Sequence, residues 1–167
     1  MIVVVMGVCG VGKTCLGPEV ARRLNAEFLE GDRFHPAANV EKMRSGAPLT
    51  GTDRGPWLRA VAAEAERFAK VGKNAVIACS ALKRRYRTIL TERVAITFVH
   101  LTGDPALIKT RMDARVGHYM PPSLLPSQLA TLEAPGLDED AITVDIDAAP
   151  TALIETIVAA LRVRSNG

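Results

Sequence analysis

The sequence predicts an α/β fold, in which a five-stranded parallel sheet is flanked by helices on both faces. Short apolar runs rich in β-branched residues alternate along the chain with longer stretches of helical character. Five strands separated by helices in this way indicate a parallel sheet with right-handed crossover connections. Ligands of such sheets bind beyond the carboxyl ends of the strands, so we expect the functional residues at that edge.

The predicted strands cover residues 2–6, 27–30, 74–79, 95–101 and 142–145. Helices are predicted over residues 13–24, 37–44, 56–71, 83–92, 104–115, 127–132 and 151–164. The helix at 56–71 is amphipathic, and Trp57, which lies on its apolar face, could belong either to the core or to a ligand site. Asp104 is expected to cap its helix, with Pro105 in the first position, where a missing N–H costs little.

Composition and charge narrow the class of protein. A chain of 167 residues fits one domain, which we expect to span 1–167. The formal net charge of +3 is small and gives no argument for a nucleic-acid partner. No apolar stretch approaches the ~18 residues that span a bilayer, and no signal peptide precedes the first strand, so we expect a cytoplasmic protein without a membrane partner. Three cysteines without paired spacing are expected to be reduced thiols.

A phosphate-binding loop follows the first predicted strand. Residues 7–14 read Gly-Val-Cys-Gly-Val-Gly-Lys-Thr and match G-x-x-x-x-G-K-[ST] at every fixed position. The glycines let backbone N–H groups surround phosphate oxygens, and the next helix presents its positive N-terminus. Lys13 is expected to reach the β- and γ-phosphates, and Thr14 to ligate Mg²⁺ through its hydroxyl. The predicted nucleotide-binding residues of this loop are Gly7, Val8, Cys9, Gly10, Val11, Gly12, Lys13, Thr14 and Cys15.

The loop alone indicates a nucleoside triphosphate and leaves the acceptor open. GTPases carry an Asn-Lys-x-Asp run to read guanine, and the sequence has none. The chain is also too short for the additional domains of motors and helicases. We therefore expect a small-molecule kinase that uses ATP and Mg²⁺, with the three-layer P-loop kinase fold, strand order 2-3-1-4-5 and a mobile lid.

Asp32 and His35, which both follow the second predicted strand, are candidates for the acceptor site. Asp32 is expected to orient or deprotonate an acceptor hydroxyl, since it follows a strand end that faces the P-loop. Its alternative role is to cap the next helix. His35 precedes Pro36 and is therefore held extended, where it could contact substrate or pack.

The sequence resembles the gluconate kinase (gluconokinase) family of P-loop sugar-acid kinases, and the resemblance spans nearly the whole chain. The most specific segments are Ser80-Ala81-Leu82-Lys83 with Tyr86-Arg87, and His35-Pro36. The others are residues 6–14, 31–32, 39–43, 45–46, 48–49, 53–54, 56–58, 117–118, 127–128 and 144–147. The chain departs from the family pattern at Cys9, where Ser is frequent, at Glu30, where Asp is usual, at Gly51, where an acid is common, and at Tyr119, where Phe is common.

The resemblance implies phosphorylation of D-gluconate on its 6-hydroxyl by ATP, in a homodimer. It implies catalytic roles for Asp32, Lys13 and Arg115, and a water-mediated contact of Glu30 with Mg²⁺. The substrate-binding segment is expected at about residues 32–58. The implied substrate-binding residues are Asp32, His35, Arg54, Lys83, Arg87, His118 and Gln128. Lys83 and Arg87 share a helix face that is expected to point into the cleft, while Arg84 and Arg85 point partly outward.

A lid is expected at about residues 116–127. In related small kinases, lid arginines stabilise the transferring phosphoryl group, and Arg111 and Arg115 lie one turn apart just before this segment. Arg111 would stack on adenine or touch phosphate. The loop that begins at Asp147 is expected to contact the adenine side of the nucleotide.

Two alternatives remain open from the sequence. One is a kinase for another small acceptor, such as shikimate or a nucleoside monophosphate, which share the architecture. The other is a nucleotide-binding regulator without transfer activity, against which Lys13, Thr14 and Asp32 argue.

Overall fold

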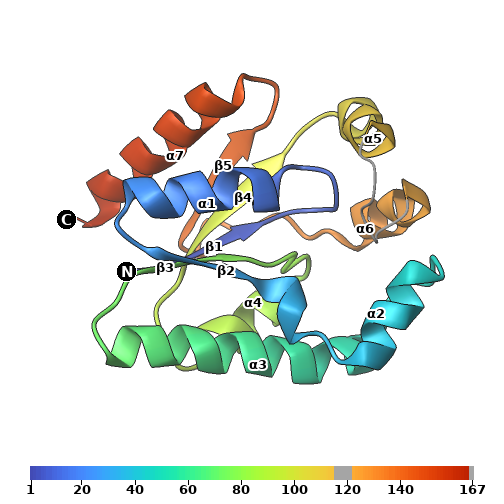
Figure 1. Ribbon diagram of the computed structural model, residues 1–167, viewed down its shortest axis with the longest axis horizontal. Coiled ribbons are helices and arrows are strands. Elements are labelled where there is room, and N and C mark those ends of the chain that lie inside the picture. The colour runs from blue at the N-terminus through green and yellow to red at the C-terminus, as the bar shows by residue number, and fades with distance from the viewer. Residues whose placement is uncertain (115–121, 166–167) are drawn as a thin grey trace.

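The fold is a parallel five-stranded sheet between two layers of helices (Figure 1). The computed structural model describes residues 1–114 and 122–165. The strands are β1 (Ile2–Met6), β2 (Glu27–Glu30), β3 (Ala75–Ala78), β4 (Thr97–Thr102) and β5 (Ala141–Asp145). They pair in the order β2-β3-β1-β4-β5, and every pair is parallel. The predicted fold class and strand order are confirmed.

The helices form the two outer layers and the carboxyl edge. Figure 1 shows α1 (Lys13–Arg23) and α7 (Pro150–Ser165) on one face of the sheet, and α3 (Gly51–Lys70) and α4 (Arg84–Thr91) on the other. The shorter elements lie towards the carboxyl ends of the strands. They are η1 (Gly31–Phe34), α2 (Ala37–Arg44), α5 (Pro105–Asp113), η2 (Pro122–Leu124) and α6 (Leu125–Thr131). In the two described stretches, no helix is both long enough and apolar enough to cross a membrane.

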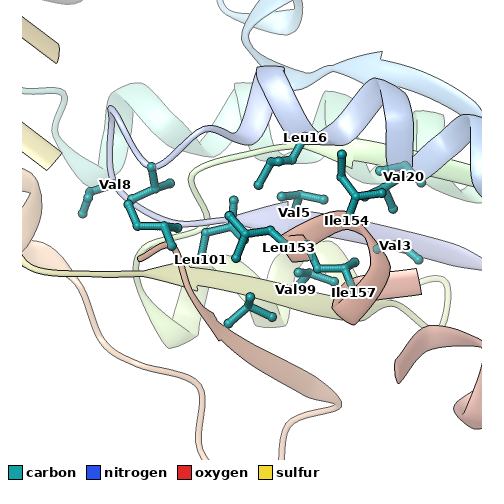
Figure 2. Close-up of a cluster of buried hydrophobic side chains, with 14 of the residues drawn as sticks. Val3, Val5, Val8, Leu16, Val20, Val99, Leu101, Leu153, Ile154 and Ile157 are labelled. Atoms are coloured by element: carbon teal, nitrogen blue, oxygen red, sulfur yellow. The ribbon is translucent and has the colours of Figure 1, made fainter. Parts of the chain in front are cut away.

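The central strand β1 is buried along its whole length because both faces of the sheet are covered. Val3 and Val5 pack into a cluster with α1 and α7, where Leu16, Val20 and Ile157 contribute (Figure 2). Ile2, Val4 and Met6 alternate to the opposite face and pack against side chains of α3. The uninterrupted apolar run of β1 therefore contributes side chains to the hydrophobic clusters on both faces of the sheet, and these contacts hold the strand at the centre of the sheet. Cys9, Cys15 and Cys79 form no disulfide within the described residues.

Helix α3 begins five residues before its predicted start at Pro56. The reason is a capping box at Thr50, whose hydroxyl accepts the Asp53 N–H at 3.2 Å. In return the Asp53 carboxylate accepts the Thr50 N–H at 2.7 Å. These bonds satisfy donors at the helix start, and the helix continues through Pro56 although this residue has no N–H to donate.

Replacing Thr50 with Ala should lower the free energy of unfolding by about 1 kcal/mol, because the first turn of α3 loses its side-chain cap. Chemical denaturation measures this difference. Thr52→Ala is the matched control, since Thr52 is an exposed threonine of the same turn. Equal effects of the two substitutions would show that the capping box does not stabilise the helix.

Candidate active site

The P-loop connects β1 to α1 and ends at the helix N-terminus. Gly7, Gly10 and Gly12 have positive φ angles of 138°, 85° and 99°. At Gly7 the need for glycine is also steric, since an added Cβ would lie 2.5 Å from the Leu101 carbonyl oxygen. The loop therefore has the left-handed backbone turns and the adjoining helix terminus that create an anion-binding cradle.

Lys13 is held against this loop. Its Nζ donates to the carbonyl oxygens of Gly7 at 2.9 Å and Val8 at 2.8 Å. Burial lowers the pKa of Lys13, and the nearby carboxylate of Asp32 acts in the opposite direction. The electrostatic coupling shows that the predicted phosphate-binding lysine and the predicted acceptor carboxylate are neighbours.

Thr14 and Glu30 provide oxygen atoms beside the loop. The Thr14 hydroxyl donates to Glu30 Oε2 at 2.8 Å, which joins the start of α1 to the end of β2. Burial raises the pKa of Glu30, while the Thr14 hydrogen bond lowers it. In the part of the chain that the structure describes, no three His, Cys, Asp or Glu side chains form a metal-binding cluster. This hydroxyl and carboxylate pair still suits Mg²⁺, which keeps several waters and takes oxygen ligands from phosphates.

Asp32 and His35 lie next to each other in and after the short helix η1. The His35 N–H donates to the Asp32 carbonyl at 3.1 Å. In the side chains, Asp32 Oδ1 and His35 Nε2 are 3.8 Å apart, and the His35 side chain is only 3% exposed. The His35 ring stacks on Trp57 with ring centroids 4.0 Å apart. Burial lowers the pKa of His35 to about 4 despite the attraction of Asp32. His35 is therefore a neutral ring fixed beside the acceptor carboxylate.

Trp57 and Asn39 hold this arrangement in place. Trp57 is 1% exposed, so it belongs to the core, and its Nε1 donates to the Gly31 carbonyl at 2.8 Å. Asn39 Nδ2 donates to the Asp53 carbonyl at 2.8 Å and lies 3.3 Å from His35 Nδ1. Sequence reasoning assigned no role to Asn39. The available signal was an amide side chain in a short helix whose neighbours Ala37, Ala38 and Val40 are apolar.

Arg54, predicted to bind the substrate, lies on the first turn of α3. Its Nη1 donates to the Leu49 carbonyl at 2.6 Å and lies 3.5 Å from the Tyr86 hydroxyl. Its positive charge also contributes to lowering the pKa of His35. Arg54 is therefore electrostatically coupled to His35, the neighbour of Asp32. Its predicted contact with the substrate stays a prediction.

The structure contradicts the expectation that Arg87 points into the cleft. Its side chain is 1% exposed and forms a bidentate pair with Glu139, at 2.5 and 2.9 Å. Its remaining nitrogen donates to the carbonyls of Glu133 at 2.9 Å and Ala81 at 3.1 Å. Ala81 has a left-handed backbone, with φ of 43°, so Arg87 also supports a strained turn after β3.

Lys83 is the N-cap residue of α4 and is half-buried. Its carbonyl accepts the N–H groups of Tyr86 at 2.9 Å and Arg87 at 3.2 Å. Its side chain lines a shallow surface depression together with Arg84, Arg85 and Glu133. Its predicted contact with the substrate stays a prediction.

Gln128 contacts the P-loop, a position that its predicted role did not anticipate. Its Oε1 accepts the Cys9 N–H at 2.7 Å, across 119 residues of sequence. Gln128 and Arg54 line the same small cavity, of about 40 Å³, next to the apolar contact of Met43, Leu49 and Leu124. Helix α6 thus joins the P-loop to the acceptor side.

Arg111 lies on the nucleotide side of the edge. Its Nη2 donates to the Ile146 carbonyl at 3.0 Å, which joins α5 to the loop after β5. Asp147 belongs to the same loop, and its N–H donates to Asp145 Oδ1 at 2.9 Å. Arg115, His118 and residues 116–121 of the predicted lid at 116–127 lie outside the described residues, and the rest of that segment forms η2 and the start of α6.

Replacing Arg87 with Ala should lower the free energy of unfolding by about 3–5 kcal/mol, because it leaves a carboxylate and two carbonyls without their buried partner. Thermal and chemical denaturation measure this loss. Arg84→Ala is the control, since Arg84 pairs with Asp138 at the surface and its loss should change stability little. A raised acceptor KM with unchanged stability in Arg87→Ala would instead restore the substrate-binding role.

Stability should fall as the pH is lowered from 6.5 to about 4, in part because of His35. In this window the unfolded state binds a proton at His35 and the folded state does not, so acid favours unfolding. His35→Phe should show a shallower fall when the free energy of unfolding is measured across these pH values. His100 remains in both proteins, and burial lowers its pKa too, so part of the slope persists. An identical slope in the variant would contradict the lowered pKa of His35.

Comparisons with known proteins agree with this geometry. The family described as an AAA domain matches residues 2–135. The gluconokinase of Gluconobacter oxydans is 48% identical over 93% of this chain and 88% of its own. The thermoresistant gluconokinase of Escherichia coli is 46% identical over 87% of this chain and 85% of its own. The crystal structure of a gluconokinase from Sinorhizobium meliloti superposes with a TM-score of 0.88 at 40% identity, covering 98% of this chain and 93% of the other. The chain therefore belongs to the gluconokinase family of P-loop kinases.

Proposed function

We propose that this chain is an ATP-dependent gluconokinase that phosphorylates D-gluconate on its 6-hydroxyl, giving 6-phospho-D-gluconate and ADP. Family membership over most of the chain is the observation that carries the choice of acceptor. The geometry supports a transferase, because a P-loop lysine and an acceptor-side carboxylate are electrostatic neighbours. Lys13 is electrostatically coupled to this carboxylate, and the charge of Arg54 acts on its neighbour His35, which suits an anionic nucleotide and an anionic acceptor.

Asp32 is the residue proposed to receive the acceptor hydroxyl. It would accept the hydrogen bond of the 6-hydroxyl and then its proton, while this oxygen bonds to the γ-phosphorus and the bond to the leaving ADP oxygen breaks. The neutral His35 ring lies 3.8 Å from this carboxylate and limits its positions. The proton passes from Asp32 to solvent after the product leaves.

Lys13 would exchange its two carbonyl partners for phosphate oxygens and offset their charge. Arg111 and Arg115 are proposed to stabilise the same phosphates from the lid side, and the loop at Asp147 to contact adenine. His118 and Lys83 are proposed as further acceptor contacts. The P-loop amides, among them that of Cys9, would hold the nucleotide in line with the acceptor.

Thr14 and Glu30 are the residues proposed to hold Mg²⁺, with Thr14 as a direct ligand and Glu30 through water. The ion, when bound, supplies positive charge that polarises the transferring phosphoryl group. The chain's own contribution is the 2.8 Å hydrogen bond that fixes the Thr14 hydroxyl towards Glu30.

An acceptor panel tests the proposed function. Purified protein with ATP and Mg²⁺ is given D-gluconate, shikimate and nucleoside monophosphates in turn, and ADP release is measured by a coupled assay. Gluconate should give the highest kcat/KM, and the product should be a 6-phosphate by NMR. A preference for shikimate or a nucleotide would replace gluconate as the substrate. ATP binding without transfer to any acceptor would indicate a regulator.

Asp32→Ala should reduce kcat by about 10²–10⁴-fold, because the acceptor hydroxyl loses its proton acceptor. ATP binding, measured by calorimetry, should survive, since the P-loop is intact. Asp138→Ala is the matched control, because Asp138 is an exposed aspartate that pairs with Arg84 outside the proposed site. Near-normal turnover of Asp32→Ala would remove Asp32 from the mechanism.

A further inference from the structure

Two guanidinium groups converge on the phenol of Tyr86, near the start of α4. Arg54 Nη1 lies 3.5 Å and Arg85 Nη2 3.3 Å from the Tyr86 hydroxyl. Their guanidinium carbons also lie 5.5 and 5.1 Å from the centre of the Tyr86 ring. Burial raises the pKa of the Tyr86 phenol, but the hydrogen bonds and charges of the two arginines bring it below its ordinary value. Tyr86 therefore lies in a strongly cationic environment.

These two arginines differ from their neighbours on α4 in having no carboxylate partner. Arg84 pairs with Asp138 and Arg87 with Glu139, so the charge of both is balanced within the protein. Across residues 1–114 and 122–165, neither Arg54 nor Arg85 has a carboxylate oxygen within 4.0 Å. Like charges that are held together without an acid create a site for an anion, and guanidinium groups match a carboxylate with two parallel hydrogen bonds.

Gly51 provides the space for Arg85. A Cβ added at Gly51 would lie 2.7 Å from Arg85 Nη2, so this guanidinium rests directly against the bare start of α3. The absence of a side chain at Gly51 leaves space for the Arg85 guanidinium beside the first turn of α3, which also carries Arg54. The acid whose charge acts on Arg85 is Glu133, which lines the same surface depression but forms no ion pair with it within 4.0 Å in the described residues. Arg85 is exposed, in agreement with the prediction that it points partly outward, and its guanidinium also lies against the start of α3.

The pair is connected to the acceptor carboxylate through Arg54. His35 lies 3.8 Å from Asp32, and the charge of Arg54 acts on His35. Arg85 shares the Tyr86 hydroxyl with Arg54. A sugar acid whose terminal hydroxyl reaches Asp32 has its carboxylate at its opposite end.

We infer that Arg85 is a specificity-determining residue, which with Arg54 binds the carboxylate of the acceptor across the Tyr86 hydroxyl and selects acids over neutral polyols. This inference rests on the proposed function. It assigns the carboxylate to the pair of Arg54 and Arg85, and excludes Arg87 from that role.

Steady-state kinetics of Arg85→Gln and Arg84→Gln test the inference. Arg85→Gln should raise the KM for D-gluconate by about ten- to a hundredfold, the range expected for a hydrogen bond to a charged group. The KM for ATP, and kcat/KM for the neutral analogue D-gluconamide, should stay within about twofold of the wild type, because neither involves the carboxylate. Arg84→Gln, the control, should match the wild type throughout. Equal gluconate KM values for the two variants would overturn the inference.

Gly51 offers a second test that leaves Arg85 in place. Gly51→Asp adds an acid beside the Arg85 guanidinium and should raise the gluconate KM, whereas Gly51→Asn adds the same bulk without charge and should raise it less. Equal effects of Asp and Asn would show that crowding, and not charge, matters, and would overturn the inference. If wild-type protein transfers no phosphate to gluconate, the proposed function fails. If the wild-type protein transfers phosphate to gluconate, but a change of charge at Gly51 or Arg85 leaves the gluconate KM unchanged, only the proposed role of Arg85 fails.

Discussion

The burial of β1 on both faces is the constraint on which the site depends. Because β1 pairs in parallel with β3 and β4, the carboxyl ends of these strands lie side by side at one edge. The P-loop, the turn after β3 and the cap of α5 all start from this edge. The apolar contacts that hold β1 in the centre of the sheet therefore also position Lys13, which follows β1, relative to Asp32, which follows β2.

A second, polar layer holds the acceptor side against the sheet. The Trp57 indole reaches the Gly31 carbonyl, and its ring supports His35, so helix α3 places two neighbours of Asp32 at once. The same helix starts at a capping box, next to which Arg54 and Gly51 meet α4. The capping box and the arginine proposed to bind the substrate, Arg54, therefore share the first turns of α3. The effects of substitutions in these turns should be measured both on the free energy of unfolding and on the KM for the acceptor.

The sequence was sufficient for features set by local patterns and insufficient for those set by distant partners. The strands, the P-loop and the position of Asp32 follow from apolar runs, a fixed motif and strand ends. Arg87 shows the limit: its spacing from Lys83 gave a helix face, but its partner Glu139 is 52 residues away and no local pattern points to it. The contact of Gln128 with Cys9 and the closeness of Arg85 to Gly51 depend in the same way on how separate elements pack.

The hydrogen bond from the Cys9 N–H to the Gln128 side chain couples ligand binding at the P-loop to the position of helix α6. Any ligand atom that takes the Cys9 N–H must displace the Gln128 oxygen, so the free energy of that bond is subtracted from the ligand's affinity. Because α6 also borders the cavity beside Arg54, its position is shared by the nucleotide and acceptor sides. A nucleotide that shifted α6 would therefore change the shape of the cavity beside Arg54, without any contact between the two ligands.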